Sequence, residues 1–323
     1  MTTIPPLPRF PYSPLVYGAV LGIAAIAFEF ALPAYPRFVF GQFAILVIIT
    51  LGVNLLLGVA GLLSLASPAF VGIGANLSTA IMLRAHVPIL ISIPIAVLAG
   101  WCIGWILGFV SLRLAGFYLA MVTFGFLDVF LVILNEGGDW TGGGYGLIVP
   151  MTTLPLIGPV TLNVVIAICA FTAGLAIVLV RELQRSRIGR AWLAIKDEPI
   201  AAEIQGIDVP RMKTLAFAVS SGLATLAGTY QALLLGVTNP SAYSLNVAVA
   251  HLTYVVVGGM TASVVGPIVG PFILFVIPEL FRAIGQYREV FYGAVLLLVL
   301  ILAPNGITGT IYDLAKRRTG PGQ

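Results

Sequence analysis

The sequence has few charged residues for its length. Asp, Glu, Lys and Arg make up 9% of the 323 residues, against about 25% in soluble domains. So few charges could not cover the surface of a water-soluble fold of this size. Hydrophobic residues make up 59% of the chain, and the mean hydropathy is +1.08. The composition therefore predicts an integral membrane protein.

Cysteine is also scarce. Cys102 and Cys169 are the two cysteines, both lie in apolar stretches, and neither has the spacing of a metal ligand. We interpret them as small apolar packing residues and expect no metal site. The net charge of +4 and the pI near 9.2 do not indicate nucleic-acid binding. The basic residues instead flank apolar stretches, as membrane topology requires.

Sequence signatures of catalysis are missing as well. No GxxxxGK[ST] phosphate-binding loop occurs, because the nearest match, from Gly206 to Thr214, has the wrong spacing. No HExxH motif occurs, and His86 and His251 lie far apart in the sequence. We therefore expect no enzyme activity and no cofactor in this chain. Any ATP, with its Mg²⁺, would bind to a partner.

Acidic residues inside apolar stretches are few. Ion-driven transporters usually carry intramembrane carboxylates as proton or sodium sites. Glu29 and Asp128 fall within such stretches here, and they form no paired relay. Asp128 has two interpretations, a contact to a pathway or loop and a structural hydrogen bond, and we favour the second. An ion-coupled secondary transporter and an intramembrane enzyme are the weaker alternatives.

Apolar stretches of membrane-spanning length, about 20 residues each, are abundant. We place about ten of them near 14–32, 38–58, 61–83, 88–110, 113–134, 160–181, 213–235, 247–259, 262–280 and 288–303. The stretch at 247–259 is short and ends in Gly258-Gly259. We expect a broken or partly unwound helix there.

The basic residues predict which side of the membrane each loop occupies, because cytoplasmic loops are enriched in Lys and Arg. We take the N-terminus as cytoplasmic and the number of spans as even. Most of the 16 Lys and Arg residues then fall inside, and the outer ones are Arg37, Arg84, Arg282 and Arg288. Both termini, including the tail 304–323, are predicted to be cytoplasmic.

The predicted fold class is an all-α polytopic membrane protein, one transmembrane domain over 1–323, with two inverted five-helix halves. The halves cover 1–134 and 160–303, on either side of an outer loop at 135–159. An odd number of spans in each half gives the halves opposite orientations, as in inverted-repeat transporters, whose solute path lies between them. Gly/Pro-interrupted stretches stand at corresponding places, Gly61 to Gly74 and Gly236 to Gly259.

Polar residues and helix interruptions inside the spans are the candidates for a solute path. Irregular backbone is tolerated in a membrane only where protein or water meets it. We interpret most of the 36 glycines as packing positions between helices. His251 has two open interpretations, a residue that lines the path and a buried hydrogen-bonding residue. The path candidates are Asn54, Ser64, Ser67, Pro68, Asn76, Asn239, Pro240, His251, Gly258 and Gly259.

Two loops carry further candidates. The inner loop, 182–212, contains the signal of a short exposed helix, with Asp197 as a cap, Pro199 in the first turn and Gly206 at the end. We expect a docking surface for a cytoplasmic subunit there, formed by Arg187, Gly189, Arg190, Lys196, Asp197, Glu198, Ala201, Ala202 and Gly206. In the outer loop the candidates are Asp139, Thr141, Gly142 and Gly143.

Several runs resemble a known family, in the family's order over about residues 50–310. The longest is SRIGRAWLAIKDEPIAAEIQGIDVPRMKTLAFAVSSGLATLAG, from Ser186 to Gly228. The others are GLLSLASPAFVGIGA (Gly61 to Ala75), LAGFYLAMVTFGF (Leu114 to Phe126), TGGGYGL (Thr141 to Leu147), VVVGGMTASVVGPIVG (Val255 to Gly270) and YGAVLLLVLILAPNGITG (Tyr292 to Gly309). Together they resemble the permeases of branched-chain amino-acid ABC importers, LivM type.

The resemblance implies a permease subunit of an ATP-driven importer in a bacterial inner membrane. The implied substrates are amino acids, branched-chain ones (Leu, Ile, Val) first, with urea, short amides or other amino acids as alternatives. The implied partners are a second permease in a heterodimer, two cytoplasmic ATP-binding subunits and an extracytoplasmic solute-binding protein.

The resemblance also implies that the inner loop carries a coupling helix. Its EAAxxxG pattern matches at Ala201, Ala202 and Gly206, with Ile200 in place of Glu. Asn76 stands where the family often has Tyr.

Overall fold

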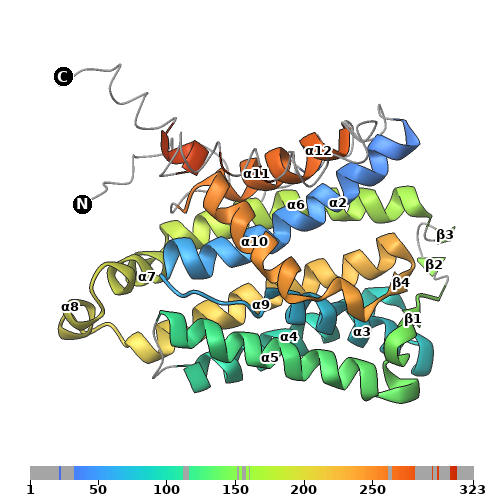
Figure 1. The fold of residues 1–323 in the computed structure, drawn as a ribbon, viewed down its shortest axis with the longest axis horizontal. Coiled ribbons are helices and arrows are strands. Elements are labelled where there is room, and N and C mark those ends of the chain that lie inside the picture. The colour runs from blue at the N-terminus through green and yellow to red at the C-terminus, as the bar shows by residue number, and fades with distance from the viewer. Residues whose placement is uncertain are drawn as a thin grey trace.

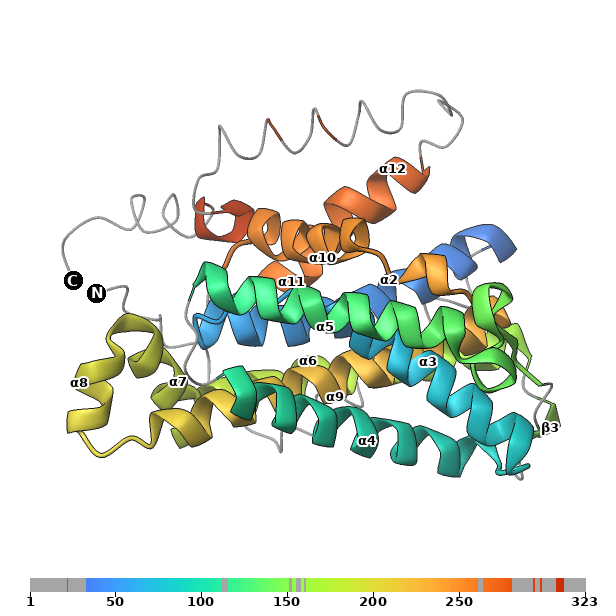
Figure 2. The ribbon, with the colours of Figure 1, turned by 60° about the horizontal axis from the view of Figure 1, so that its bottom comes forward.

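The computed structural model describes residues 22, 33–111, 116–150, 153–154, 158–159, 161–260, 264–280, 293, 297 and 306–310. The long helices lie roughly along one axis, with α7 (Arg187–Asp197) and α8 (Pro199–Ile204) at one end and the short strands at the other (Figure 1 and Figure 2). Apart from residues 22, 293 and 297, the spans expected at 14–32 and 288–303 lie outside the described residues, as does most of the tail at 304–323.

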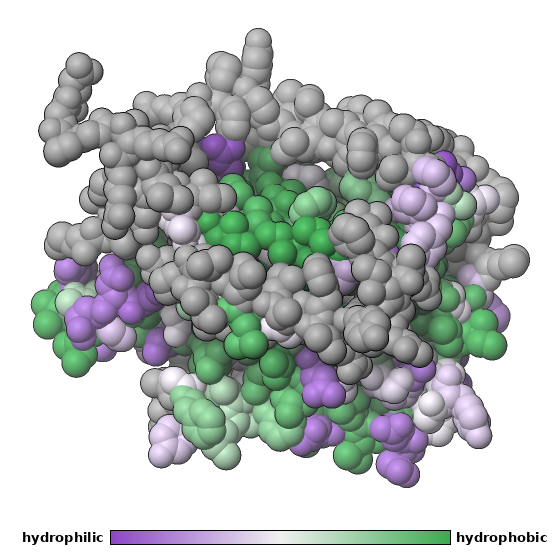
Figure 3. All heavy atoms as spheres, turned by 45° about the horizontal axis from the view of Figure 1, so that its top comes forward, coloured by the Kyte–Doolittle hydropathy of each residue, from purple (hydrophilic) through white to green (hydrophobic). Residues whose placement is uncertain are grey.

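Six helical segments in the described part are long and apolar enough to cross a membrane. They are α2 (Ala34–Asn54) with the π-helical turn that follows it (Leu55–Val59), α4 (Ile89–Val110), α5 (Phe117–Glu136), α6 (Leu162–Arg185), α9 (Val209–Leu235) and the segment Pro240–Gly258, which ends in α10 (Leu245–Gly258). Large apolar side chains such as Leu98 and Phe109 of α4 are exposed, and apolar residues gather in the middle of the face drawn in Figure 3. An all-α polytopic membrane protein is confirmed.

Helix α3 (Ser67–Arg84) begins later than the sequence indicates. A span was expected at 61–83, but residues 61–66 are not helical. Gly61 adopts a φ of +71°, which a residue without a Cβ tolerates and which ends the preceding helical turn. Pro68 lies in the first turn of α3, where its missing N–H costs little. The chain therefore enters this span as an extended segment.

Helix α9 packs against α2, α3, α4 and α6. Glycines allow the close approach. A Cβ on Gly104 of α4 would lie 1.7 Å from Ser221 Oγ, and one on Gly100 would lie 1.9 Å from Thr225 Oγ1. On α3, a Cβ on Gly74 would lie 1.9 Å from the Thr225 carbonyl oxygen. These glycines are packing positions, as expected, because close backbone contact is what holds helices together in lipid.

Between residues 240 and 280 the helices are short. Helix α10 stops at Gly258, and Gly259 has a φ of +113°, which confirms the expected break. The next elements, inside the span expected at 262–280, are α11 (Gly266–Pro271), a π-helical turn (Phe272–Val276) and α12 (Ile277–Leu280). Helix α11 packs against α10 and α2, and Thr50 Oγ1 of α2 donates to the Pro267 carbonyl at 2.7 Å.

The inner loop at 182–212 contains two helices where the sequence indicates one. Helix α8 is the expected short helix. Helix α7 is an additional one, and Ser186 caps it by accepting hydrogen bonds from the backbone N–H groups of Ile188 and Gly189 at 3.1 and 3.4 Å. Helix α6 continues to Arg185, past the expected end of its span at 181.

The opposite end of the bundle carries the outer loop, 135–159. Strand β1 (Leu147–Ile148) pairs antiparallel with β4 (Val237–Thr238), which follows α9. Strand β2 (Thr153–Leu154) pairs with β3 (Gly158–Pro159). Single-turn 3₁₀ helices cover Gly138–Trp140, Gly143–Tyr145 and Pro240–Ala242. The β1–β4 pair ties the outer loop to the second half of the chain.

Candidate functional site

A small pocket opens between α2, the extended segment 61–66, α3, α9 and α10. Serine hydroxyls and apolar side chains share its wall. The lining residues are Val53, Leu56, Leu57, Leu62, Ser64, Ser67, Phe70, Phe217, Ser220, Ser221, Ala224 and Leu252. The wall thus combines hydrogen-bonding groups with an apolar surface, and the cavity of about 10 Å³ has room for roughly one water molecule.

The extended segment is held in place by α5, and the start of α3 by α10. The Leu65 backbone N–H donates to Thr123 Oγ1 of α5 at 2.9 Å, which satisfies a backbone group outside regular structure. Ser67 Oγ and His251 Nδ1 of α10 are hydrogen-bonded at 3.1 Å, and His251 is buried. The structure therefore brings together Ser64, Ser67 and His251, which the sequence placed on the path.

The sequence did not single out Ser220 and Ser221 of α9. Both side chains are buried and line the pocket. The signal was the adjacent hydroxyl pair in the run FAVSSGLA. The sequence does not show which face of α9 meets the extended segment, so the pair could not be assigned to the pocket.

Apart from Ser64 and Ser67, the expected path residues, His251 included, do not line this pocket. Asn76 lies towards the outer end of the bundle, where its Nδ2 donates to the Gly72 carbonyl at 2.9 Å and its Oδ1 accepts from Thr238 Oγ1 at 3.0 Å. The side chain of Asn239 accepts a hydrogen bond from the backbone N–H of Ser241 at 3.0 Å. The remaining residues of this set are Asn54 and Pro68, both buried, Pro240 in a 3₁₀ turn, and Gly258 and Gly259 at the end of α10. Their place on the path stays a prediction.

The outer-loop candidates build the turn itself. The Asp139 carbonyl accepts a hydrogen bond from the guanidinium of Arg84, whose carbon lies 4.2 Å from the Trp140 ring centre. Thr141 Oγ1 donates to the Leu134 carbonyl at 2.6 Å. Gly142 and Gly143 follow with φ of +76° and +56°. These contacts fix the loop against α3 and α5.

Helix α8 carries apolar side chains on the surface of the inner end. Ile200 is 69% exposed and Ile204 is 82% exposed, whereas Ala202 is buried. Gly206 ends the helix with a φ of +83°, and its N–H donates to the Glu203 carbonyl at 2.9 Å. Two isoleucines on a short exposed helix provide an apolar surface to which another protein can bind.

Helix α7 anchors α8 to the bundle. Trp192 is fully buried, and its Nε1 donates to the Met212 carbonyl of α9 at 2.7 Å. Lys196 Nζ donates to the Gly58 carbonyl at 2.6 Å, at the end of the π-helical turn, where a cation suits the unpaired carbonyls. A Cβ on Gly61 would lie 2.9 Å from Lys196 Cγ. Lys196 therefore joins the inner helices to the start of the extended segment.

The remaining inner-loop candidates divide into one packing residue and several exposed ones. A Cβ on Gly189 would lie 2.1 Å from the Gln184 carbonyl oxygen, so Gly189 allows α7 to pack against α6. The charged side chains at the surface are those of Arg187, Arg190, Asp197 and Glu198. Ala201 is partly buried beside them. Their contact with a partner remains a prediction.

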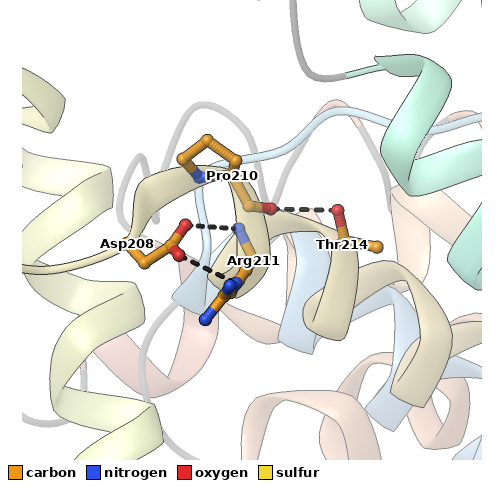
Figure 4. A network of polar contacts seen from close by, with 4 residues as sticks. All are labelled: Asp208, Pro210, Arg211 and Thr214. Carbon is orange, nitrogen blue, oxygen red and sulfur yellow. Dashed lines mark hydrogen bonds and ion pairs between the residues drawn. The ribbon is translucent and has the colours of Figure 1, made fainter.

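The first turn of α9 is fixed directly after α8 (Figure 4). Asp208 Oδ1 accepts a hydrogen bond from the Arg211 backbone N–H at 3.1 Å, and Asp208 Oδ2 lies 3.0 Å from Arg211 Nε. Thr214 Oγ1 donates to the Pro210 carbonyl at 2.9 Å. In the part of the chain that the structure describes, no three His, Cys, Asp or Glu side chains lie together as metal ligands would.

Comparison with known proteins gives the family. The model of the family described as branched-chain amino acid transport system / permease component matches residues 35–303. The chain belongs to this family. No solved structure matches the chain.

Several curated permeases are similar to the chain. It is 29% identical over 303 residues to the high-affinity branched-chain amino acid transport system permease protein LivM of Escherichia coli (strain K12). This match covers 85% of this chain and 70% of that protein. It is 28% identical over 223 residues to the autoinducer 2 import system permease protein LsrC of Salmonella paratyphi B. This match covers 65% of this chain and 62% of that protein. These relatives are therefore named for chemically different solutes.

Proposed function

We propose that the chain is the permease subunit of an ATP-binding-cassette importer for amino acids, with branched-chain amino acids as the first candidates. The observation that carries the ATP-driven part is α8, a short helix that exposes Ile200 and Ile204 beyond the bundle. Membership of a transport permease family supports the same conclusion. ATP binding to partner subunits would move α8, and α7 would pass the movement into the bundle.

The lining of the pocket suits an amphiphilic solute, and the cavity of about 10 Å³ has to widen before an amino acid can enter it. The hydroxyls of Ser64 and Ser67 provide hydrogen bonds to a carboxylate or ammonium group, and Leu56, Phe70 and Phe217 provide apolar contact to a side chain. A branched aliphatic amino acid has both parts. Urea and short amides are the second candidates, because the serines suit them while the apolar wall gains little from them.

The contacts of the helices support two inverted halves. Helix α2 is the second span of the first half and α9 the second span of the second half, and they pack on each other. Helix α9 contacts α3 and α4, and α2 contacts α10 and α11. A two-fold axis between α2 and α9 would exchange these two sets, as inverted repeats require. We propose about ten spans, with both termini cytoplasmic.

The proposal includes partners and their cofactors. A second permease, two cytoplasmic ATPases that bind ATP and Mg²⁺, and an extracytoplasmic solute-binding protein would complete the transporter in the bacterial inner membrane. Helix α8 would contact an ATPase. The loop around Trp140 and Tyr145, which are 68% and 96% exposed, would face the binding protein.

Uptake by purified, reconstituted complexes tests the proposal. We expect proteoliposomes with all subunits to take up radiolabelled leucine when ATP is inside, and not when ATP is replaced by an analogue that cannot be hydrolysed. Uptake of urea or acetamide without competition by leucine would overturn the substrate class. Ion-driven uptake by this chain alone would overturn the ATP-driven mechanism in favour of a secondary transporter.

A further inference from the structure

Helix α3 begins in the middle of the bundle, beside the pocket. Its first residue, Ser67, is hydrogen-bonded to His251, which lies half-way along α10. The first N–H groups of a helix have no partner within the helix, and they give its N-terminus a partial positive charge. The N-cap residue Ala66 provides no side-chain cap. The start of α3 therefore keeps this partial charge where Ser67 and Phe70 line the pocket.

Two serine hydroxyls on the same wall lack an acceptor. Ser220 of α9 is 5% exposed and lines the pocket, and in the part of the chain that the structure describes no hydrogen bond joins its hydroxyl. Ser64 is 7% exposed, and its Oγ accepts the Ala66 N–H at 3.3 Å, which leaves its own hydrogen without an acceptor among these residues. Buried polar groups are normally hydrogen-bonded. Both hydroxyls therefore indicate an acceptor that enters the pocket.

The chemistry of the wall favours an oxyanion as that acceptor. None of the described residues that line the pocket carries a charged side chain. An ammonium group would find no carboxylate there, and the partial positive charge of α3 would disfavour it. A carboxylate, by contrast, accepts several hydrogen bonds at once and is stabilised at a helix N-terminus. Leu56, Phe217 and Leu252 on the same wall suit the hydrocarbon part of such a solute.

We propose that Ser64, Ser220 and the N-terminus of α3 form a carboxylate subsite, which binds the carboxylate of an amino-acid solute while its side chain lies against Leu56 and Phe217. This inference rests on the proposed function and narrows its substrate class, because urea and short amides have no carboxylate. Helices that begin inside a membrane direct their N-termini at anionic solute groups in other transporters. The subsite orients the solute with its carboxylate towards α3.

The subsite has a rigid side and a side that can move. A Cβ on Gly74 of α3 would lie 1.9 Å from the Thr225 carbonyl oxygen of α9, so these two helices are in close backbone contact. The N-terminus of α3 and Ser220 of α9 are therefore held together. Ser64 belongs to the extended segment 61–66, which lies outside the hydrogen-bond ladders of the helices. The cavity of about 10 Å³ widens for a solute when this segment moves away from α9.

Binding of leucine analogues to the purified complex tests the orientation. The binding protein is left out, so that its own selectivity does not enter, and saturation-transfer NMR detects weak binding directly. Isocaproate is leucine without the amino group, and isoamylamine is leucine without the carboxyl group. We expect isocaproate to displace leucine, and isoamylamine and leucinamide to bind roughly tenfold more weakly. Binding of isoamylamine as tight as that of isocaproate, or no binding of isocaproate, would overturn the proposal.

A substitution on the rigid side tests the residues. Ser220→Ala should weaken the binding of leucine and isocaproate roughly tenfold and leave that of isoamylamine unchanged, since only the carboxylate loses a donor. A merely structural role would weaken all three alike. The matched control is Ser78→Ala, because Ser78 of α3 is buried, does not line the pocket, and donates to the Gly74 carbonyl at 2.6 Å. Melting temperatures check that both variants fold.

Two results would refute the assignment to Ser220. One is unchanged binding of isocaproate by Ser220→Ala, and the other is an equal loss of isocaproate and isoamylamine binding. These measurements use neither ATP nor the binding protein. Their failure would leave ATP-driven leucine uptake, and with it the proposed function, in place. Failure of that uptake would refute the proposed function without changing the preference for isocaproate over isoamylamine.

Discussion

Replacing Gly104 with Ala tests the contact between α4 and α9. A Cβ at this position would lie 1.7 Å from Ser221 Oγ, 2.6 Å from Ser221 Cβ and 3.1 Å from the Phe217 carbonyl oxygen. Rotation of the serine hydroxyl removes only the first of these clashes. The helices must therefore separate, and Ser221, which lines the pocket, must move with α9.

The magnitude follows from two opposing effects. Extra atoms forced into a packed contact typically cost about 1–3 kcal/mol, and the short distances place this contact at the upper end. Ala in place of Gly inside a helix returns about 0.5–1 kcal/mol. We expect Gly104→Ala to lower the free energy of unfolding by about 2 kcal/mol. The melting temperature should fall by at least about 4 °C.

The assay is thermal unfolding of the purified protein, with Gly222→Ala as the control. Gly222 faces α4 from α9, and its Cβ would lie 3.3 Å from Trp101 Cδ1, an exposed ring that can move. Adding Ser221→Ala to Gly104→Ala should restore part of the stability, because the nearest atom is removed. Equal melting temperatures for Gly104→Ala and Gly222→Ala would refute this account of the packing.

Three further substitutions test the inner and outer ends. Gly206→Val should abolish most ATP-driven uptake without preventing assembly, because the φ of +83° at this position does not suit a β-branched residue. Gly206→Asn should keep most of the uptake. Normal uptake by Gly206→Val would count against a coupling role for α8. Lys196→Met should reduce the amount of solute moved per ATP hydrolysed roughly fivefold, because the hydrogen bond to the Gly58 carbonyl is lost. Lys213→Met, which removes the same charge, is the control. Equal solute-to-ATP ratios in the two variants would contradict this role of Lys196. Asn76→Ala should cost about 1–3 kcal/mol of stability, since the buried Thr238 hydroxyl loses its acceptor; an unchanged unfolding midpoint would show that this bond is unimportant.

Local signals in the sequence predicted the features that depend on local chemistry. Gly258-Gly259 predicted the short helix α10, because two adjacent glycines end a helix wherever it packs. Pro199 and Gly206 predicted α8 from turn preferences. The cap expected at Asp197 is wrong, because Asp197 ends α7 and Glu198 is the N-cap of α8, without a side-chain hydrogen bond. Helix α7 was missed although Ser186 is a good cap, because its apolar residues Ile188, Trp192 and Ile195 form only a short amphipathic stripe within a basic loop.

The features that were missed depend on tertiary contacts. The run GLLSLA at 61–66 reads as the start of an apolar span, and hydropathy does not record that Gly61 has a φ of +71° or that Thr123 binds the Leu65 N–H. Ser220 and Ser221 join the pocket only because α9 turns that face to the extended segment. Asn76, by contrast, was expected on the path and binds Thr238 near the outer end.

The most direct test of the central claim is a cross-link from Ile204, the more exposed of the two isoleucines of α8. A photo-reactive side chain at this position in intact cells should capture a nucleotide-hydrolysing subunit, and the yield should change when ATP is depleted. The same side chain at Leu98 of α4 should not capture that subunit. Failure to capture an ATPase from position 204, or modification of Ile204→Cys by a reagent that reaches only the outer surface of the cell, would contradict the account.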